Sequence, residues 1–258
     1  MPKPMSGPMQ AVVSFARYPI GDLQAPAARD VIAAARRQLD TTGLCMLPNF
    51  ITGDALATMR TEALAALPLA VRHAAPLAQN LDLGITPMRI QSALSYDLFG
   101  PQSPLRQLYE WDGLAALCRA ILNEPHFYTC EDPHVSCFVT SFANGDELGW
   151  HYDTMDTAVT MVLQDSDSGG VFEFARNSRE AGPATEREVA AGRNGHVRQV
   201  RIPPGALTFF HGRHSLHRVT PVGPGRPRLT LTMCFHGTPG KQFDLAARRV
   251  YAGDRATI

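Results

Sequence analysis

Residues 145–153 read Gly-Asp-Glu-Leu-Gly-Trp-His-Tyr-Asp, and a second histidine, His217, follows in the strand-like run His-Arg-Val-Thr-Pro-Val. Alternate side chains of a β-strand face the same side, so His151 and Asp153 project together while Tyr152 points away. Arg228 begins a further apolar run 11 residues after His217. An isolated His-x-Asp is common by chance. Combined with a distant histidine and a trailing arginine, each in strand-like sequence, it forms a specific pattern.

This pattern indicates a metal site. Two imidazoles and one carboxylate can occupy one face of an octahedral ion and leave three positions open, as in non-haem Fe(II) sites. A structural zinc site would normally need four protein ligands, often including cysteine, and no cysteine lies near either segment. We therefore expect His151, Asp153 and His217 to bind Fe(II). His214 is the rival to His217, because His211, His214 and His217 are close in sequence; an unliganded histidine there could hydrogen-bond a ligand or the substrate.

Arg228 is a candidate anion-binding residue. It begins the last apolar strand, and Thr230 lies on the same face two residues later. A guanidinium group binds a carboxylate through two parallel hydrogen bonds, and a threonine hydroxyl can add another. A buried arginine in an apolar strand needs such a partner. The sequence leaves two partners open, a bound carboxylate or an Asp or Glu of the chain itself.

Composition narrows the class of protein. The 258 residues are 45% hydrophobic and 19% charged, enough to bury a substantial core. Basic and acidic residues balance at 24 each, so we expect neither a nucleic-acid nor a membrane partner. No apolar run approaches the roughly 18 residues of a membrane span, and residues 1–10 do not resemble a secretory signal. Five scattered cysteines are typical of reduced thiols. These features predict a cytoplasmic protein; they do not determine the oligomeric state.

The chain is expected to form one domain preceded by an arm. Residues 1–24 are rich in proline and are predicted to be an irregular N-terminal arm. Residues 25–258 are predicted to be a single domain. Within that domain we expect mostly helical support and a lid over 25–124, a jelly-roll core over 125–240, and a C-terminal tail over 241–258.

The expected helical support region, residues 25–124, contains helical patterns on both sides of a segment, 70–102, with little regular pattern. Residues 25–39 and 103–123 carry apolar side chains at helical spacing, and a further helix between them can be capped by Thr52 or Asp54. Residues 70–102 contain proline and glycine with little regular pattern. We therefore expect them to form a long loop or lid.

After Pro125, short runs rich in Val, Thr and Phe alternate with Gly, Pro, Asp and Asn. Eight runs have this character: 135–142, 150–152, 159–164, 171–175, 197–202, 206–210, 215–220 and 228–235. Strands this short and numerous predict a double-sheet jelly roll, in a mainly β fold with N-terminal helices. Asn144-Gly145-Asp146 predicts a hairpin turn between the first two runs.

The ligand pattern resembles that of Fe(II)/2-oxoglutarate-dependent dioxygenases. More closely, residues 103–240 resemble the free-amino-acid radical halogenases and their hydroxylase relatives. Four segments carry this likeness: Ser-Pro-Leu-Arg-Gln-Leu-Tyr-Glu-Trp at 103–111, the stretch 145–153, Leu163-Gln164 ahead of Gly169-Gly170, and Gly-Arg-His-Ser-Leu-His-Arg-Val-Thr-Pro-Val at 212–222. The resemblance implies a double-stranded β-helix with helical support. It also implies Fe(II) at the three proposed ligands, 2-oxoglutarate held by Arg228 and Thr230, and O2 as the oxidant.

The implied reaction is hydroxylation of an unactivated C–H bond, with release of succinate and CO2. Halogenases of this group lack the ligand carboxylate, because a halide takes its place on iron. Asp153 is present here and favours a hydroxylase, although desaturation and cyclisation can follow from the same substrate radical. The expected substrate is a small polar molecule, a free amino acid or derivative. The alternatives are a protein or peptidyl side-chain hydroxylase and a non-oxygenase, cupin-like metal-binding jelly roll.

Candidate substrate contacts are Arg89 on the expected lid and His134, Glu147 and Trp150 near the ligand strand. Arg89 offers a cation that could pair with a substrate carboxylate. The other three are polar or aromatic residues close in sequence to His151. Each of the four could instead have a surface or packing role. No catalytic residue beyond the metal ligands is expected.

Overall fold

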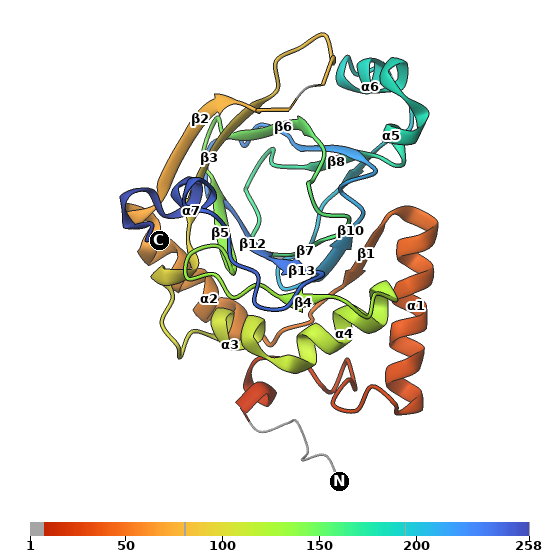
Figure 1. Cartoon of the computed structure of the whole chain (residues 1–258), viewed down its shortest axis with the longest axis vertical. Helices are drawn as coiled ribbons and strands as arrows, with labels where there is room; N and C mark the ends of the chain where they lie inside the picture. The colour runs from red at the N-terminus through yellow and green to blue at the C-terminus, as the bar shows by residue number, and fades with distance from the viewer. Residues whose placement is uncertain (1–7, 80, 194, 258) are drawn as a thin grey trace.

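The computed structural model describes residues 8–79, 81–193 and 195–257. Its main feature is a curled antiparallel sheet with helices packed around its outside (Figure 1). The strand order is β1-β10-β7-β12-β5-β3-β6-β11-β8-β9, with β2 paired to β3. A small second sheet joins β13 to β4. This arrangement agrees with the predicted mainly β fold with helical support.

The strands before residue 145 are β1 (Leu44–Leu47), β2 (Val71–Pro76), β3 (Met88–Leu94), β4 (Tyr128–Thr129) and β5 (Cys137–Phe142). Those after it are β6 (Glu147–His151), β7 (Ala158–Gln164), β8 (Phe172–Ala175), β9 (Val197–Val200), β10 (Leu207–Phe210), β11 (Leu216–Val219), β12 (Arg228–Met233) and β13 (Phe235–His236). Each of the eight runs expected after Pro125 overlaps one of these strands. Short runs rich in Val, Thr and Phe between turn residues are therefore a reliable strand signal in this half of the chain.

The helices are α1 (Pro26–Thr42), α2 (Gly53–Ala66), α3 (Pro104–Glu110), α4 (Asp112–Leu122), α5 (Ser178–Ala181), α6 (Pro183–Ala190) and α7 (Leu245–Ala252). Short 3-10 turns lie at Pro8–Ala11, Leu67–Leu69, Tyr96–Leu98 and Gly253–Arg255. Thr52 caps α2 by accepting a hydrogen bond from the backbone N–H of Ala55. None of the helices in the described ranges is long and apolar enough to cross a membrane.

The prediction of a long loop over 70–102 was wrong. Residues 71–76 and 88–94 form β2 and β3, and β3 lies inside the sheet between β5 and β6. The sequence of β2, Val-Arg-His-Ala-Ala-Pro, has few residues with strand preference, so pairing with the rest of the sheet must stabilise it. The described residues of the β2–β3 connection, 77–79 and 81–87, lack regular structure.

The predicted hairpin at Asn144-Gly145-Asp146 is also corrected. The turn is present, and Gly145 adopts the positive φ of 83° that favours glycine. However, β5 and β6 diverge after it, and β3 pairs with both, through Ser92 with Ser141 and Ile90 with Glu147. The inserted strand matters because it contributes a wall of the cavity described below.

The described parts of the expected N-terminal arm and C-terminal tail contain more ordered structure than the sequence indicated. Residues 1–7 of the expected arm lie outside the described part, but from residue 9 onward the segment packs into the core, where Val12, Val13 and Ile20 are buried. The expected C-terminal tail contains α7. Apolar residues spaced irregularly through a proline-rich segment give no periodic signal, which is why the sequence does not predict the packing of residues 9–24.

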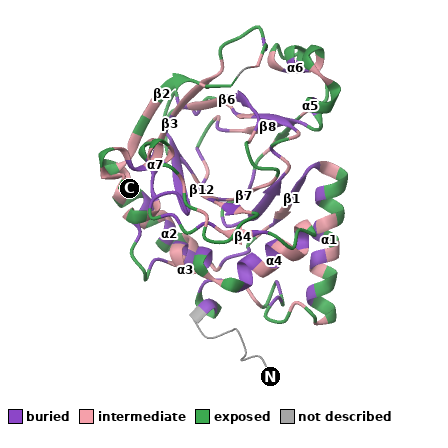
Figure 2. Ribbon diagram, viewed as in Figure 1, coloured by how far each residue is buried: buried purple, intermediate pink, exposed green. Residues whose placement is uncertain are grey.

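The main hydrophobic core lies between the helices and the outer face of the curled sheet (Figure 2). Strand β12 shows how the sheet divides its side chains: Leu229, Leu231 and Met233 belong to this core. The alternate residues Arg228, Thr230 and Thr232 line a cavity on the inner face. One strand therefore contributes to stability on one side and to the candidate site on the other.

The buried ion pair that attaches α7 to the rest of the domain provides a stability test. Arg248 Nε lies 2.9 Å from Asp132 Oδ2, with the two side chains only 5% and 0% exposed. Arg248→Met leaves a buried carboxylate without its cation, so we expect the free energy of unfolding to fall by about 3–5 kcal/mol in urea denaturation. Arg226→Met is the matched control, because the Arg226–Asp167 pair is exposed and should contribute less than about 1 kcal/mol. Equal losses in the two variants would contradict this account.

Candidate metal centre

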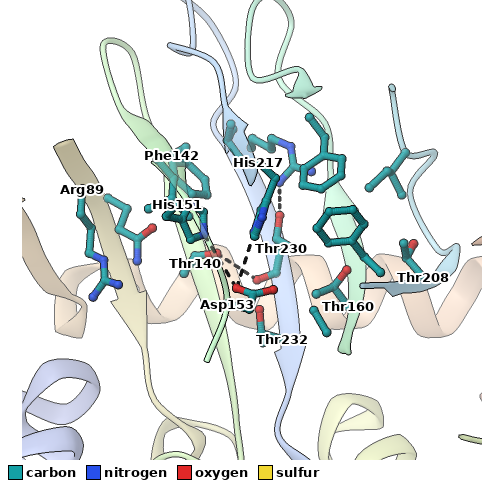
Figure 3. A pocket seen from close by; sticks show the side chains of 18 of the residues that line it. Arg89, Thr140, Phe142, His151, Asp153, Thr160, Thr208, His217, Thr230 and Thr232 are labelled. Carbon is teal, nitrogen blue, oxygen red and sulfur yellow. Dashed lines mark hydrogen bonds and ion pairs between the residues drawn. The ribbon is translucent and has the colours of Figure 1, made fainter. Parts of the chain in front are cut away.

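The structure brings His151, Asp153 and His217 together. His151 is the last residue of β6 and pairs directly across the antiparallel ladder with His217 of β11. The two rings lie 4.0 Å apart between centroids. Asp153 Oδ1 lies 3.8 Å from His151 Nε2 and 3.5 Å from His217 Nε2. One donor atom from each residue lies within 4.8 Å of the others, so the three can share one ion (Figure 3).

The histidine rings are oriented by their second nitrogens. His151 Nδ1 lies 2.8 Å from the carbonyl oxygen of Gly149, and His217 Nδ1 lies 2.9 Å from that of Ser215. A proton on each Nδ1, donated to these carbonyls, leaves each Nε2 lone pair directed at the shared centre. Burial lowers the pKa of His151 to about 3. His151 is therefore neutral at physiological pH, the protonation state in which imidazole binds a metal.

Gly212 makes room for the carboxylate. The backbone N–H of Asp153 donates to the Gly212 carbonyl oxygen at 3.1 Å. A Cβ atom on Gly212 would lie only 1.8 Å from Asp153 Oδ2. Any larger residue at this position would therefore displace the carboxylate from the two histidines.

His214, the rival ligand, lies outside the cluster of His151, Asp153 and His217. Its Nδ1 lies 3.2 Å from Glu180 Oε1 on α5. His211 instead contacts Thr157 through Nδ1 at 3.1 Å. Neither histidine lines the cavity that contains the cluster. The geometry therefore favours His217 as the second histidine ligand.

The cluster lies in a cavity of about 290 Å³ inside the curled sheet. The wall combines small hydroxyl side chains with aromatic rings. The threonines are Thr140, Thr154, Thr160, Thr208, Thr230 and Thr232, and the aromatic residues beyond the ligand segment are Phe138, Phe142, Phe172, Phe210 and Tyr251. Such a wall suits a small molecule that has both polar and apolar parts.

Arg228 lies in the cavity wall without an acidic partner. Its side chain is buried, and its guanidinium donates a hydrogen bond to the Thr230 hydroxyl. Among the described residues, no Asp or Glu forms an ion pair with it. Burial lowers the pKa of Arg228 to about 10, so it remains charged at neutral pH. The internal salt bridge considered from the sequence is thus not found, and a bound carboxylate would satisfy this buried cation.

The candidate substrate contacts separate into two groups. Arg89 on β3 lines the cavity, and its buried Nε has no hydrogen-bond partner. His134 lies elsewhere, between Asp97 and Thr257. Trp150 stacks beneath Arg218, and neither Trp150 nor Glu147 is part of the cavity wall. Of the four residues, geometry supports a substrate role only for Arg89.

Besides five of the cavity's threonines, sequence reasoning missed three larger polar residues that line the cavity: Gln79, Gln91 and Tyr251. Gln91 Oε1 is buried without a partner. Gln91 and Arg89 share one face of β3, so recognising that strand would have identified both. Tyr251 comes from α7 and packs against Phe138, with ring centroids 4.2 Å apart and the ring planes tilted by 38°. No local signal marks this long-range contact.

Residues 27–249 match a family model described as Halogenase D. The chain belongs to this family. The Halogenase D match agrees with the resemblance noted from the sequence, and the metal-ligand segments both lie within the matched residues. A search of curated proteins found no match.

Solved structures share the fold of this Halogenase D family member. A prolyl-4-hydroxylase from Pseudomonas putida is 18% identical, with a TM-score of 0.53 over 80% of this chain and 98% of that one. The epimerase SnoN, in complex with Fe3+ and α-ketoglutarate, is 16% identical, with a TM-score of 0.59 over 80% and 84%. HygX from Streptomyces hygroscopicus, with nickel and 2-oxoglutarate, is 15% identical, with a TM-score of 0.55 over 80% and 87%. These likenesses confirm the predicted double-stranded β-helix fold.

The close approach at Gly212 provides a test of the metal centre. We expect Gly212→Ala to lower the affinity for Co(II), a redox-stable substitute for Fe(II), by at least about 10-fold in calorimetry, because the new methyl group displaces Asp153. Gly53→Ala is the control, since a Cβ there meets nothing within 4 Å. Unchanged Co(II) affinity in Gly212→Ala would exclude Asp153 as a ligand in this geometry.

Proposed function

We propose that this chain is an Fe(II)- and 2-oxoglutarate-dependent hydroxylase of a small, carboxylate-bearing substrate, a free amino acid or derivative. The observation that carries the proposal is the combination, in one cavity, of a two-histidine, one-carboxylate cluster with an unpaired buried Arg228. The cluster fits Fe(II), and the arginine fits the distal carboxylate of 2-oxoglutarate. In the proposed reaction, substrate C–H, 2-oxoglutarate and O2 yield the alcohol, succinate and CO2.

The matching family model is described as a halogenase, but Asp153 supports hydroxylation as the reaction of this chain. The carboxylate lies within reach of the same centre as both imidazoles, and Gly212 provides the space that it occupies. A halide would need that ligand position to be vacant. With Asp153 in place, Fe(II) would be held by His151, Asp153 and His217 and would supply oxygen activation with 2-oxoglutarate as the co-substrate.

The protein residues orient and hold the reactants. Arg228 and Thr230 would bind the distal carboxylate, and the Nδ1 hydrogen bonds of the two histidines fix the ligand rings. The apolar rings of the wall exclude water from the reacting bond. Iron bound at this site would supply the oxygen activation that is coupled to decarboxylation of 2-oxoglutarate. Positioning is therefore the contribution of the chain itself.

Charge balance supports a carboxylate on the substrate. The positive charges of Fe(II) and Arg228 are matched by Asp153 and the two carboxylates of 2-oxoglutarate. Arg89 remains without an opposite charge among the described cavity residues, and its Nε is buried and unpartnered. A substrate carboxylate would satisfy it. Gln91 Oε1, on the same face of β3, is an unpartnered acceptor for a neighbouring N–H or O–H of the substrate.

Co-substrate affinity tests the role of Arg228. We expect Arg228→Gln to weaken 2-oxoglutarate binding to the Co(II)-loaded protein by about 2–5 kcal/mol, or at least about 30-fold, because a buried charge pair is lost. Since the pKa of Arg228 is about 10, wild-type affinity should persist at neutral pH and fall as the pH rises through that value. Calorimetry across pH measures both effects. Arg226→Gln, at an exposed position, is the control; equal weakening in both variants would refute the assignment.

Turnover tests the reaction and the substrate class. We expect Fe(II), 2-oxoglutarate and one of the twenty amino acids or their derivatives to give succinate and a product that has gained one oxygen atom by mass spectrometry. Arg89→Gln should raise the KM for that substrate by about 10- to 100-fold, through loss of a charged hydrogen bond, and leave 2-oxoglutarate affinity unchanged. Asp153→Ala should give no product. A chlorinated product from the wild-type enzyme in chloride would refute the hydroxylase assignment.

A further inference from the structure

Gln79 makes an unusual pair of contacts with the residue between two metal ligands. Its Nε2 donates to the carbonyl oxygen of Tyr152 at 2.6 Å, and the backbone N–H of Tyr152 donates to Gln79 Oε1 at 3.1 Å. One side-chain amide therefore satisfies both backbone polar groups of Tyr152, as a neighbouring β-strand would. Gln79 also lines the cavity that contains the metal cluster.

The backbone of this segment has few other supports. Strand β6 ends at His151, where the ladder with β11 pairs it to His217. Asp153 is held by one backbone hydrogen bond to Gly212. Between these two points, Gln79 provides the hydrogen bonds that fix the peptide groups on either side of Tyr152. The spacing between His151 and Asp153 depends directly on the orientation of those peptide groups.

The side chain of Tyr152 is held on the opposite side by α5 and α6. Its hydroxyl donates to Glu186 at 2.8 Å, and Arg179 lies over its ring at 3.9 Å. Leu83, from the same β2–β3 connection as Gln79, packs into this cluster with Tyr152. An exposed ion pair, Asp82–Arg187 at 3.0 Å, also joins the connection to α6. The connection thus contacts Tyr152 directly through Gln79 and reaches α6 independently through Asp82.

We propose that Gln79, an exposed residue of the β2–β3 connection, is a positioning residue for the metal centre. This inference rests on the proposed metal site. The Gln79 amide holds the Tyr152 peptide groups so that His151 and Asp153 face one ion together. The β2–β3 connection is thereby coupled to ligand geometry. A glutamine side chain can make both hydrogen bonds to the Tyr152 backbone, because its primary amide offers a donor and an acceptor in one plane.

Two variants test the amide. Gln79→Met keeps the length but removes donor and acceptor, and Gln79→Asn keeps the amide but shortens its reach. We expect both to lower Co(II) affinity by about 10- to 100-fold, as loss of a group that supports metal ligands typically does. The visible absorption bands of bound Co(II) should shift because the ligand geometry changes, and the Tyr152 amide should exchange with deuterium faster. None of these three measurements, of Co(II) affinity, absorption and amide exchange, requires turnover.

Arg187→Ala is the matched control. It removes the Asp82 ion pair from the same connection but leaves the bonds of Gln79 to Tyr152 intact. We expect its Co(II) affinity to stay within about twofold of the wild type, with unchanged absorption bands. Thermal unfolding of each variant separates a change at the site from a loss of folding.

The outcomes distinguish the inference from the proposed function. If the wild type binds Co(II) and both Gln79 variants bind it with the same affinity and spectrum, the positioning role is overturned and the metal site stands. The positioning role is also overturned if Arg187→Ala changes affinity and spectrum as much as Gln79→Met does. If the wild type itself binds no Co(II), the proposed function fails, and the positioning role fails with it.

Discussion

The pairing of His151 with His217 across β6 and β11 is the constraint on which the rest of the site depends. Residues directly opposite in an antiparallel ladder place their side chains on the same face of the sheet. Two imidazoles from distant parts of the sequence are thereby brought to a ring separation of 4.0 Å. A shift of one residue in the pairing register of β6 and β11 would turn one imidazole ring to the opposite face of the sheet. The register shifts between His217 and Val219, and such an irregularity re-aims side chains at the point where the ligands are needed.

The same sheet that sets the ligands also carries the stability of the domain. Strand β12 buries Leu229 and Leu231 against the helices and presents Arg228 and Thr230 to the cavity. The buried cation is therefore held by a strand whose other face is fixed by the main hydrophobic core. This arrangement stabilises an otherwise unfavourable feature, an unpaired arginine in an apolar interior, and leaves it available for a ligand.

Most of what the sequence predicted correctly depends on local periodicity. The eight runs after Pro125 contain their own signal, because short runs rich in Val, Thr and Phe separated by turn residues mark strands. The alternation expected for His151 and Asp153 holds less well, because β6 ends at His151 and Asp153 lies beyond it. Strand β3 could not be recognised in this way, since Met88–Leu94 is defined by its insertion between β5 and β6. Gln91 was missed with it. Tyr251 was missed for a related reason, because its contact with Phe138 joins α7 to a strand more than a hundred residues earlier.

The three candidate metal ligands are not fixed in the same way. The two histidines are held by the strand ladder and by backbone carbonyls, so the sheet itself determines their positions. Asp153 lies beyond the end of β6 and depends on Gly212 and on the peptide groups held by Gln79. The sheet can therefore form whichever side chain occupies position 153. The placement of Asp153 therefore depends on contacts outside the β6–β11 ladder, whereas the placement of the two histidines does not.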